Sequence, residues 1–198
     1  MTQTSAGAEN LSETTASHFS IDGRASRFTV RAFAAGLLSA VGHNPTIAIR
    51  DFSGGMNFNF EKLEASGFAL VIKAASLAVQ DDVSLKDRRE MERLMNEAIL
   101  ESAKFPEIRY EAAAISVSRV SDMLFGATID GELSLRGVSR RLPITARVTL
   151  LGSMLRASGE FGLKQTDYGI KLMSFAGGAL KLKDELKFSF EIVARRQE

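Results

Sequence analysis

Two runs of alternating apolar and polar residues fill the stretch 129–150, and a short interruption at 136–139 separates them. Side chains in a β-strand point to opposite faces with a period of two, so each run is typical of a half-buried strand. Gly137 takes positive φ angles freely and therefore suits a reversing loop. The stretch predicts a β-hairpin with one charged and one apolar face. The apolar face comprises Ile129, Leu133, Leu135, Leu142, Ile144, Ala146, Val148 and Leu150.

Alternation recurs elsewhere and predicts an all-β protein. The further segments are 27–34, 47–60, 68–77, 107–119, 155–161 and 180–192. With the hairpin they give about eight strands and no strand–helix–strand repeat, which is typical of a sandwich or a closed barrel. Because closure removes exposed edges, we favour the barrel. The pair Gly54-Gly55 within one strand predicts a bulge or sharp coil at a barrel corner, with a hairpin turn as the alternative.

One segment has a helical period instead. Between residues 87 and 102, apolar side chains recur at spacings of three and four, which predicts an amphipathic helix. Asp87 and Glu90 resemble a capping box at its start. We expect this helix to lie against one opening or one side of the barrel. The apolar side chains are Met91, Leu94, Met95, Ala98 and Ile99.

Charge and cysteine content exclude several classes of partner and of functional site. The 198 residues carry 25 basic and 24 acidic side chains, so we expect no general attraction to nucleic acid or to an anionic membrane. The absence of cysteine removes disulfides, thiolate catalysis and cysteine–metal sites. No run approaches the 18 or so apolar residues of a membrane-spanning helix, so we expect no stable membrane insertion.

The N-terminal segment differs in composition from the rest. Residues 1–20 are rich in Ser, Thr, Ala and Glu, which predicts a mobile tail followed by a single domain at 21–198. The first residues lack a basic start and an apolar stretch, so we expect a cytoplasmic protein. A periplasmic location applies if the start is misassigned or the segment trimmed.

Few residues are suited to metal or acid–base chemistry. The chain has two histidines, His18 and His43, and a zinc site needs about three or four ligands. We therefore expect no metal. No G-x-S-x-G motif accompanies His43, and a corner histidine bonded to backbone is the favoured interpretation. Asp81 and Asp82 are adjacent and so poorly placed for paired acid–base work.

Phenylalanine is the abundant aromatic residue, with 13 copies against two tyrosines and no tryptophan. Those on alternating strands indicate either an ordinary packed core or a lumen that holds an apolar ligand. Small residues at inward positions, Ala32, Ala34, Gly131 and Ala146, favour space over filling. The alternating phenylalanines are Phe28, Phe58, Phe60, Phe68, Phe188 and Phe190.

Several short motifs, in order between about residues 26 and 195, resemble the YceI-like family of lipocalin-like, polyisoprenoid-binding proteins. They are 51–54 (DFSG), 75–77 (ASL), 104–110 (KFPEIRY), 131–138 (GELSLRGV), 142–144 (LPI), 166–170 (TDYGI) and 183–185 (KDE). Residues 36–45 (GLLSAVGHNP) look like a branch of the family distinct from the better-known lipid binders.

The resemblance implies an antiparallel, lipocalin-like barrel of about eight strands with one inserted helix and a hydrophobic cavity. The hairpin would then form two neighbouring wall strands, with Leu142 and Val148 among the inward residues. We expect the partner to be an apolar small molecule or lipid, with a homodimer left open. We expect no cofactor and no catalytic residue; an isoprenoid lipid or a quinone is the candidate bound molecule. The candidate ligand-binding residues are Phe28, Val30, Phe58, Phe60, Phe68, Leu70, Ile129, Leu133, Ile144, Phe188 and Phe190.

Three functions follow as hypotheses. The leading one is non-enzymatic binding of an amphiphilic isoprenoid or other long-chain lipid, for storage, transport or sequestration. The second is an enzyme acting on a lipid-like substrate at the barrel rim, with His43 transferring a proton. The third is a stress-related structural module whose lumen is packed with side chains.

Overall fold

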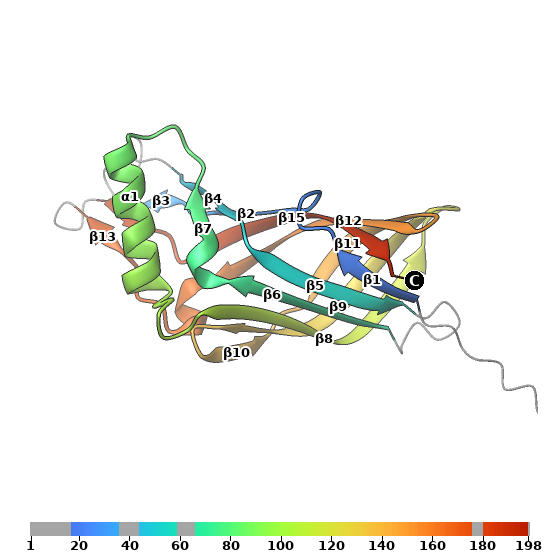
Figure 1. Ribbon diagram of the computed structural model, residues 1–198. Helices are drawn as coiled ribbons and strands as arrows, with labels where there is room; N and C mark the ends of the chain where they lie inside the picture. The colour runs from blue at the N-terminus through green and yellow to red at the C-terminus, as the bar shows by residue number, and fades with distance from the viewer. Residues whose placement is uncertain (1–16, 36–43, 59–65, 176–179, 198) are drawn as a thin grey trace, which may run out of the picture.

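A closed antiparallel barrel of eight strands dominates the computed structural model, which describes residues 17–35, 44–58, 66–175 and 180–197 (Figure 1). Each strand bonds to the next, and pairing between the first and the last closes the ring. The predicted all-β barrel with one helix is confirmed. In order around the barrel the strands are β1 (Ser17–Ile21), β5 (Phe52–Phe58), β6 (Gly67–Lys73), β8 (Glu107–Arg119), β9 (Leu124–Leu135), β11 (Ile144–Leu151), β12 (Met154–Lys164) and β15 (Glu185–Arg196).

Three barrel strands continue past a break and extend the wall at one end. β2 (Arg27–Arg31) follows β1 and pairs with β15, and β4 (Thr46–Ile49) precedes β5. β7 (Leu77–Val79) follows β6 after the 3₁₀ turn η2 (Ala74–Ser76), and it pairs with β4. Because the described β7 pairs only with β4, the wall separates between β7 and β8 at this end.

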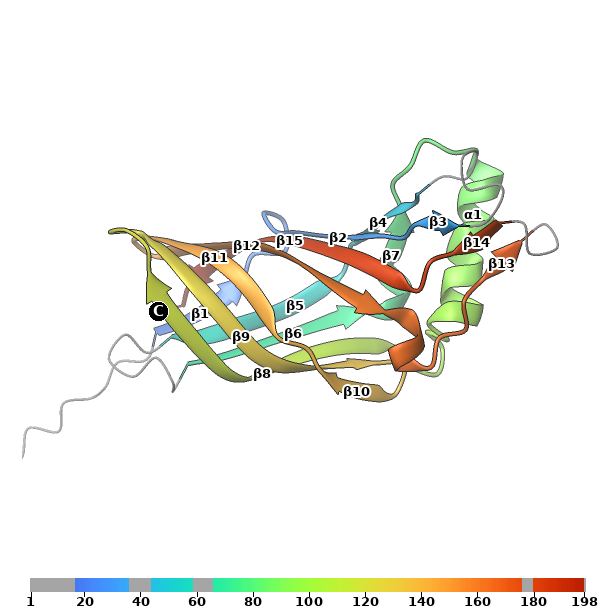
Figure 2. The same cartoon turned by 180° about the vertical axis from the view of Figure 1, so that it is seen from behind.

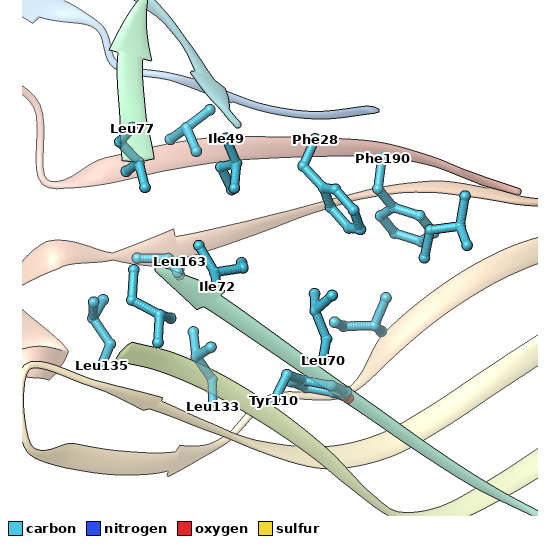
Figure 3. Packing of buried hydrophobic residues seen from close by; sticks show 14 of the residues in the cluster. Phe28, Ile49, Leu70, Ile72, Leu77, Tyr110, Leu133, Leu135, Leu163 and Phe190 are labelled. Carbon is cyan, nitrogen blue, oxygen red and sulfur yellow. The ribbon is translucent and has the colours of Figure 1, made fainter. Parts of the chain in front are cut away.

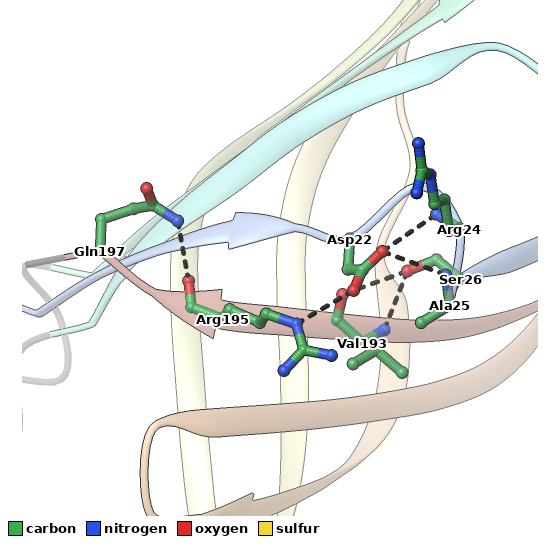
Figure 4. A network of polar contacts seen from close by, with 7 residues as sticks. All are labelled: Asp22, Arg24, Ala25, Ser26, Val193, Arg195 and Gln197. Atoms are coloured by element: carbon green, nitrogen blue, oxygen red, sulfur yellow. Dashed lines mark hydrogen bonds and ion pairs between the residues drawn. The ribbon is translucent and has the colours of Figure 1, made fainter.

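The break between β1 and β2 is tied to β15 by two polar side chains (Figure 4). The Asp22 carboxylate accepts hydrogen bonds from the backbone N–H of Arg24 and Ala25 and from the Arg195 guanidinium at 3.0 Å. The ion pair with Arg195 is the main reason that the pKa of Asp22 lies below its ordinary value. Ser26 is buried, and its hydroxyl bonds both the N–H and the carbonyl of Val193. These contacts replace the ladder bonds that the break removes.

The helix covers the separated end of the wall. α1 (Leu85–Leu94) continues into a π-helical turn η3 (Met95–Ile99), in which the Leu100 N–H reaches the Met95 carbonyl. The Glu92 carboxylate accepts a hydrogen bond from the Val79 N–H of β7. The helix thus satisfies part of the exposed edge of that strand.

The predicted helix start was wrong by three residues. Ser84 is the N-cap, and its hydroxyl accepts the Asp87 N–H while donating to the Asp87 carboxylate. The capping pair is therefore Ser84 with Asp87 rather than Asp87 with Glu90. The apolar side chains used for the prediction begin only at Met91, so the expected start of the helix was placed too late.

Smaller elements complete the helix-bearing end (Figure 2). β3 (Ala34–Ala35), β14 (Leu180–Leu182) and β13 (Ser174–Phe175) form a three-stranded sheet. The 3₁₀ helix η4 (Gln165–Tyr168) follows β12.

The predicted hairpin is present, with a tighter turn than expected. Leu135 pairs directly with Val138, so Arg136 and Gly137 alone reverse the chain, both with positive φ. The strand β10 (Val138–Arg141) pairs with β9, and after Pro143 the strand β11 continues beside it. The eight side chains of the predicted apolar face all belong to the core cluster or pack against it.

Two other predictions are wrong because neighbouring strands determine the local structure. Residues 17–20, assigned to the tail, form most of β1, which pairs with β5 and β15.

The pair Gly54-Gly55 is neither a bulge nor a turn, since β5 and β6 stay in register across it. A Cβ at Gly54 would lie 2.3 Å from the Ala69 carbonyl oxygen, and one at Gly55 2.7 Å from that of Phe19. The glycines allow close approach of the strands on both sides. The irregular position is in β8, where the register shifts between Ala112 and Ala114.

We predict that Gly54→Ala lowers the free energy of unfolding by about 1–3 kcal/mol, because the new methyl group meets backbone that has little room to move. Gly67→Ala is the matched control, since a Cβ there meets nothing within 4 Å. Urea unfolding followed by circular dichroism measures both. Equal stability of the two variants would contradict the close strand approach.

Candidate ligand-binding cavity

An apolar cavity of about 710 Å³ occupies the barrel interior. Its walls come from every barrel strand except β1, together with β2, β4, β7 and the helix. Figure 3 shows side chains from opposing walls, such as Phe28 and Leu70, pointing toward one another across the lumen. The volume lies within the range of about 300–1,000 Å³ that small-molecule sites occupy. A lumen fully packed with side chains, the third hypothesis from the sequence, does not agree with this cavity.

Strict alternation places the lining side chains. On β9, Phe125, Ala127, Ile129, Leu133 and Leu135 line the cavity. The inward phase is therefore apolar along nearly the whole strand, as the period of two requires. The neighbouring strands β11 and β12 follow the same rule, and β15 does so except at Ser189, which also lines the cavity.

The structure brings together most of the residues that the sequence singled out. Of the eleven candidates, ten line the cavity, and Phe60 lies outside the described residues. His43 also lies outside them. Leu142, expected to face inward, packs against the core but does not line the cavity. The ten are Phe28, Val30, Phe58, Phe68, Leu70, Ile129, Leu133, Ile144, Phe188 and Phe190.

Part of the cavity wall is made of alanine, which leaves space at inward positions. Ala127 and Ala146 are direct cross-strand partners on β9 and β11, and Ala157 lies on the next strand, β12. All three are buried and line the cavity. Only Ala146 of the three was predicted from the sequence, although the inward phase of β9 and β12 also includes Ala127 and Ala157.

Gly131 does not leave space for a ligand, contrary to the expectation. A Cβ there would lie 2.6 Å from the Tyr110 ring and from the Glu111 carbonyl oxygen. The Tyr110 ring therefore occupies the position that the missing side chain vacates. The strand pairing that places Tyr110 there joins residues far apart in sequence, which is why alternation alone did not reveal it.

Phenylalanines form the wall on the β2, β12 and β15 side. Phe28 meets Phe190 in a stacked arrangement with ring centroids 6.5 Å apart, and Phe161 stacks on Phe188 at 5.0 Å. Phe161 lines the cavity but was not among the candidates. Such ring pairs stabilise each other beyond simple burial, so contacts among its own side chains stabilise this wall.

The polar groups of the lining already have partners. The Tyr110 hydroxyl donates toward the carbonyls of Leu142 at 2.9 Å and Ile129 at 3.2 Å. The buried Gln165 amide donates to the Lys183 carbonyl at 2.9 Å. Among the described lining residues Arg119 alone carries a charged side chain, and it pairs with Asp122 at 3.0 Å. The described part of the lumen is thus suited to an apolar ligand.

Burial determines the ionisation of Tyr110. Loss of solvent, with a smaller contribution from the nearby Asp130 carboxylate, raises the pKa of Tyr110 to about 12. Only the neutral hydroxyl carries the single proton that it shares between the two backbone carbonyls, with the shorter contact to Leu142. Tyr110 therefore acts as a neutral wall residue rather than as an acid or a base near neutral pH.

Neither metal clusters nor membrane-spanning helices are found in the described part of the chain. There, no three or more His, Cys, Asp or Glu side chains gather in a way that could hold a metal ion. No helix within the described ranges is long and apolar enough to cross a membrane.

Comparison with known families decides the relationship. A family model described as the YceI-like domain matches residues 15–194. The chain belongs to the YceI-like family. The match spans the described barrel except for the last two residues of β15. A search of curated proteins gives no match.

Solved structures share this YceI-like barrel. A polyisoprenoid-binding domain from Saccharophagus degradans, implicated in plant cell wall breakdown, has a TM-score of 0.66 at 15% identity, covering 92% of this chain and 100% of that one. BcnA from Burkholderia cenocepacia has a TM-score of 0.65 at 14% identity, with 87% and 98% covered. The Campylobacter jejuni YceI protein has a TM-score of 0.60 at 16% identity, with 79% and 88% covered. At these identities the likeness shows the fold.

Motif residues of the YceI-like pattern hold the helix-bearing end together. Arg136 donates to the Glu101 carboxylate and to the Gly169 carbonyl, so it joins the helix end, the hairpin turn and η4. Asp184 accepts from both the N–H and the hydroxyl of Thr166, and these bonds hold the pKa of Asp184 below its ordinary value. Their contacts explain the motifs without direct contact with the cavity.

We predict that Tyr110 ionises near pH 12 in the folded protein. Because its pKa is raised on folding from an ordinary value of 10.0, the neutral ring stabilises the fold below that pH, and this contribution is lost as pH rises toward 12. The chain has two tyrosines, so the Tyr168→Phe variant reports Tyr110 alone by tyrosinate absorbance. Ionisation of that variant near pH 10, while it remains folded, would contradict the burial.

Proposed function

We propose that this protein binds one long-chain isoprenoid or comparable amphiphilic lipid in the barrel cavity and does not change it chemically. The continuous apolar lumen of about 710 Å³ is the observation that carries the proposal. The ten lining residues named above would contact the chain. The name of the Saccharophagus degradans domain, which describes polyisoprenoid binding, supports the same ligand class.

The cavity dimensions suit a chain rather than a compact molecule. β8 and β15 span 13 and 12 residues. At about 3.3 Å per residue and a tilt near 40°, such strands give a barrel roughly 30 Å long. The lining includes residues from both ends, from Ile99 beside the helix to Leu150 at the opposite turns. An extended apolar tail would follow this axis.

Burial of the tail supplies the affinity. Each buried methylene group is worth about 0.8 kcal/mol, so ten carbons contribute roughly 8 kcal/mol before the costs of ordering are subtracted. An isoprenoid quinone has a tail of the same kind and is a second candidate within this ligand class.

The lining supports binding rather than catalysis. Its tyrosine hydroxyl and buried glutamine amide are already bonded to backbone carbonyls. Catalysis requires a group within reach of the substrate that is free to transfer a proton or attack. Ser189 and Asn57 also line the cavity, and their side chains bond to Thr29 and His18. The enzyme hypothesis therefore depends on His43.

We predict that an organic extract of natively purified protein contains a co-purified lipid with a long apolar tail. Mass spectrometry of the extract identifies it, and an isoprenoid is distinguished from a fatty acyl chain by its mass. An empty extract, together with no binding of added polyprenyl alcohol, would refute the proposed function.

We also predict that Ala146→Phe weakens the binding of a polyprenyl alcohol at least about tenfold, because the ring fills part of the lumen. Thr145→Phe is the matched control, since Thr145 is exposed on the outer face of the same strand. Fluorescence titration measures both affinities, and circular dichroism checks the fold. Equal affinities in the two variants would place the ligand outside the cavity.

A further inference from the structure

Exposed apolar side chains gather at the end of the barrel opposite the helix. Val120 and Met123 are 65% and 55% exposed in the turn between β8 and β9, and Leu151 is 40% exposed where β11 ends. The Leu150 N–H donates to the Met123 carbonyl at 3.2 Å, so the two turns lie side by side. They project at the same end in both views (Figures 1 and 2). We call Val120, Met123 and Leu151 the turn patch.

The surroundings of the turn patch are basic among the described residues. The segments 117–126, 147–158 and 193–197 hold five arginines and one acid, Asp122. Arg119 pairs with Asp122, and Arg195 pairs with Asp22 beyond these segments. The others form no ion pair with a described residue. They are Arg147, Arg156 and Arg196.

The cavity reaches this same end. Val117, Arg119, Phe125 and Leu150 line it there, next to the turn patch. At the other end the helix lies over the lumen, with Met91, Leu94, Met95 and Ile99 in the lining. Within the described ranges, therefore, the helix covers one end of the lumen, and no helix covers the end with the turn patch.

We propose that the turn-patch end docks on the surface of an anionic lipid bilayer. Apolar side chains on projecting turns can enter the boundary between headgroups and acyl chains, and their burial adds to electrostatic attraction. Arginines near the surface are attracted to acidic headgroups. Apolar side chains on the turns, arginines that form no ion pair with a described residue, and the cavity lining thus lie at one end, where a lipid would pass between bilayer and barrel.

A second copy of the chain fits the patch less well. A stable interface buries roughly 800 Å² per partner, from about 20–30 residues on each side. Three apolar side chains on narrow turns fall far short of that. The arginines around them would also face the same arginines in a symmetric pair. Docking itself does not depend on the proposed function; passage of a ligand at this end does.

The test is co-sedimentation of the full chain with vesicles. We expect binding to vesicles of phosphatidylcholine with phosphatidylglycerol, weakened by salt, and at least about tenfold weaker binding to phosphatidylcholine alone. The triple variant Val120→Ser, Met123→Ser and Leu151→Ser should lose at least about tenfold in partition to the anionic vesicles. Arg147→Gln with Arg156→Gln should lose several-fold, because both arginines lie on strands beside the turns.

The opposite end supplies the matched control. Leu85 and Leu172 are also large, apolar and exposed, at 68% and 43%. The double variant Leu85→Ser and Leu172→Ser should bind anionic vesicles within about twofold of the unmodified chain. Thermal unfolding of each variant confirms that it is folded.

Three results would overturn the docking proposal. They are no binding of the unmodified chain to anionic vesicles, equal loss in the turn-patch and control variants, and a dimer in solution that only the turn-patch variant abolishes. Affinity for polyprenyl alcohol, measured without vesicles, should stay unchanged in the turn-patch variant. If the unmodified chain does not bind polyprenyl alcohol, the proposed function is refuted, and vesicle binding stands as a separate result.

Discussion

Closure of the barrel through β1 is the constraint on which the rest of the structure depends. This strand of five residues bonds to β5 on one side and to β15 on the other. Asp22 and Ser26 then hold the break after it against β15. Once eight strands form a ring, its circumference sets the width of the lumen. The side chains at inward positions decide how much of that width stays open, and the alanines on β9, β11 and β12 leave it partly unfilled.

The two ends of the ring are built differently. The wall separates between β7 and β8, and the helix that fills the separation is held by Glu92 at one point and by the Arg136 contacts at another. The other end consists of turns in the described ranges, with apolar and basic side chains exposed. The helix thus covers the apolar lumen at one end only, and the proposed bilayer contact at the other end follows from this difference.

Alternation in the sequence was enough to predict the strands and ten residues of the lining, because burial with period two is a local property of each strand. Most failures involve partners on other strands; the helix start is the exception, because Ser84 caps it through Asp87, only three residues away. Gly54 is explained by the backbone of β6, Gly131 by the Tyr110 ring, and β1 by two strands that begin far from it in sequence. The ligand class could not be predicted from spacing at all; it came from a resemblance, and the cavity volume now supports it independently.

Electron density inside the lumen tests the central claim most directly. A high-resolution crystal structure of protein purified without detergent should show continuous tubular density along the barrel axis, in contact with Ala146, Phe188 and Phe190. Density for ordered water along the lumen, or side chains that close it completely, would contradict the account of an apolar cavity built to hold a lipid chain.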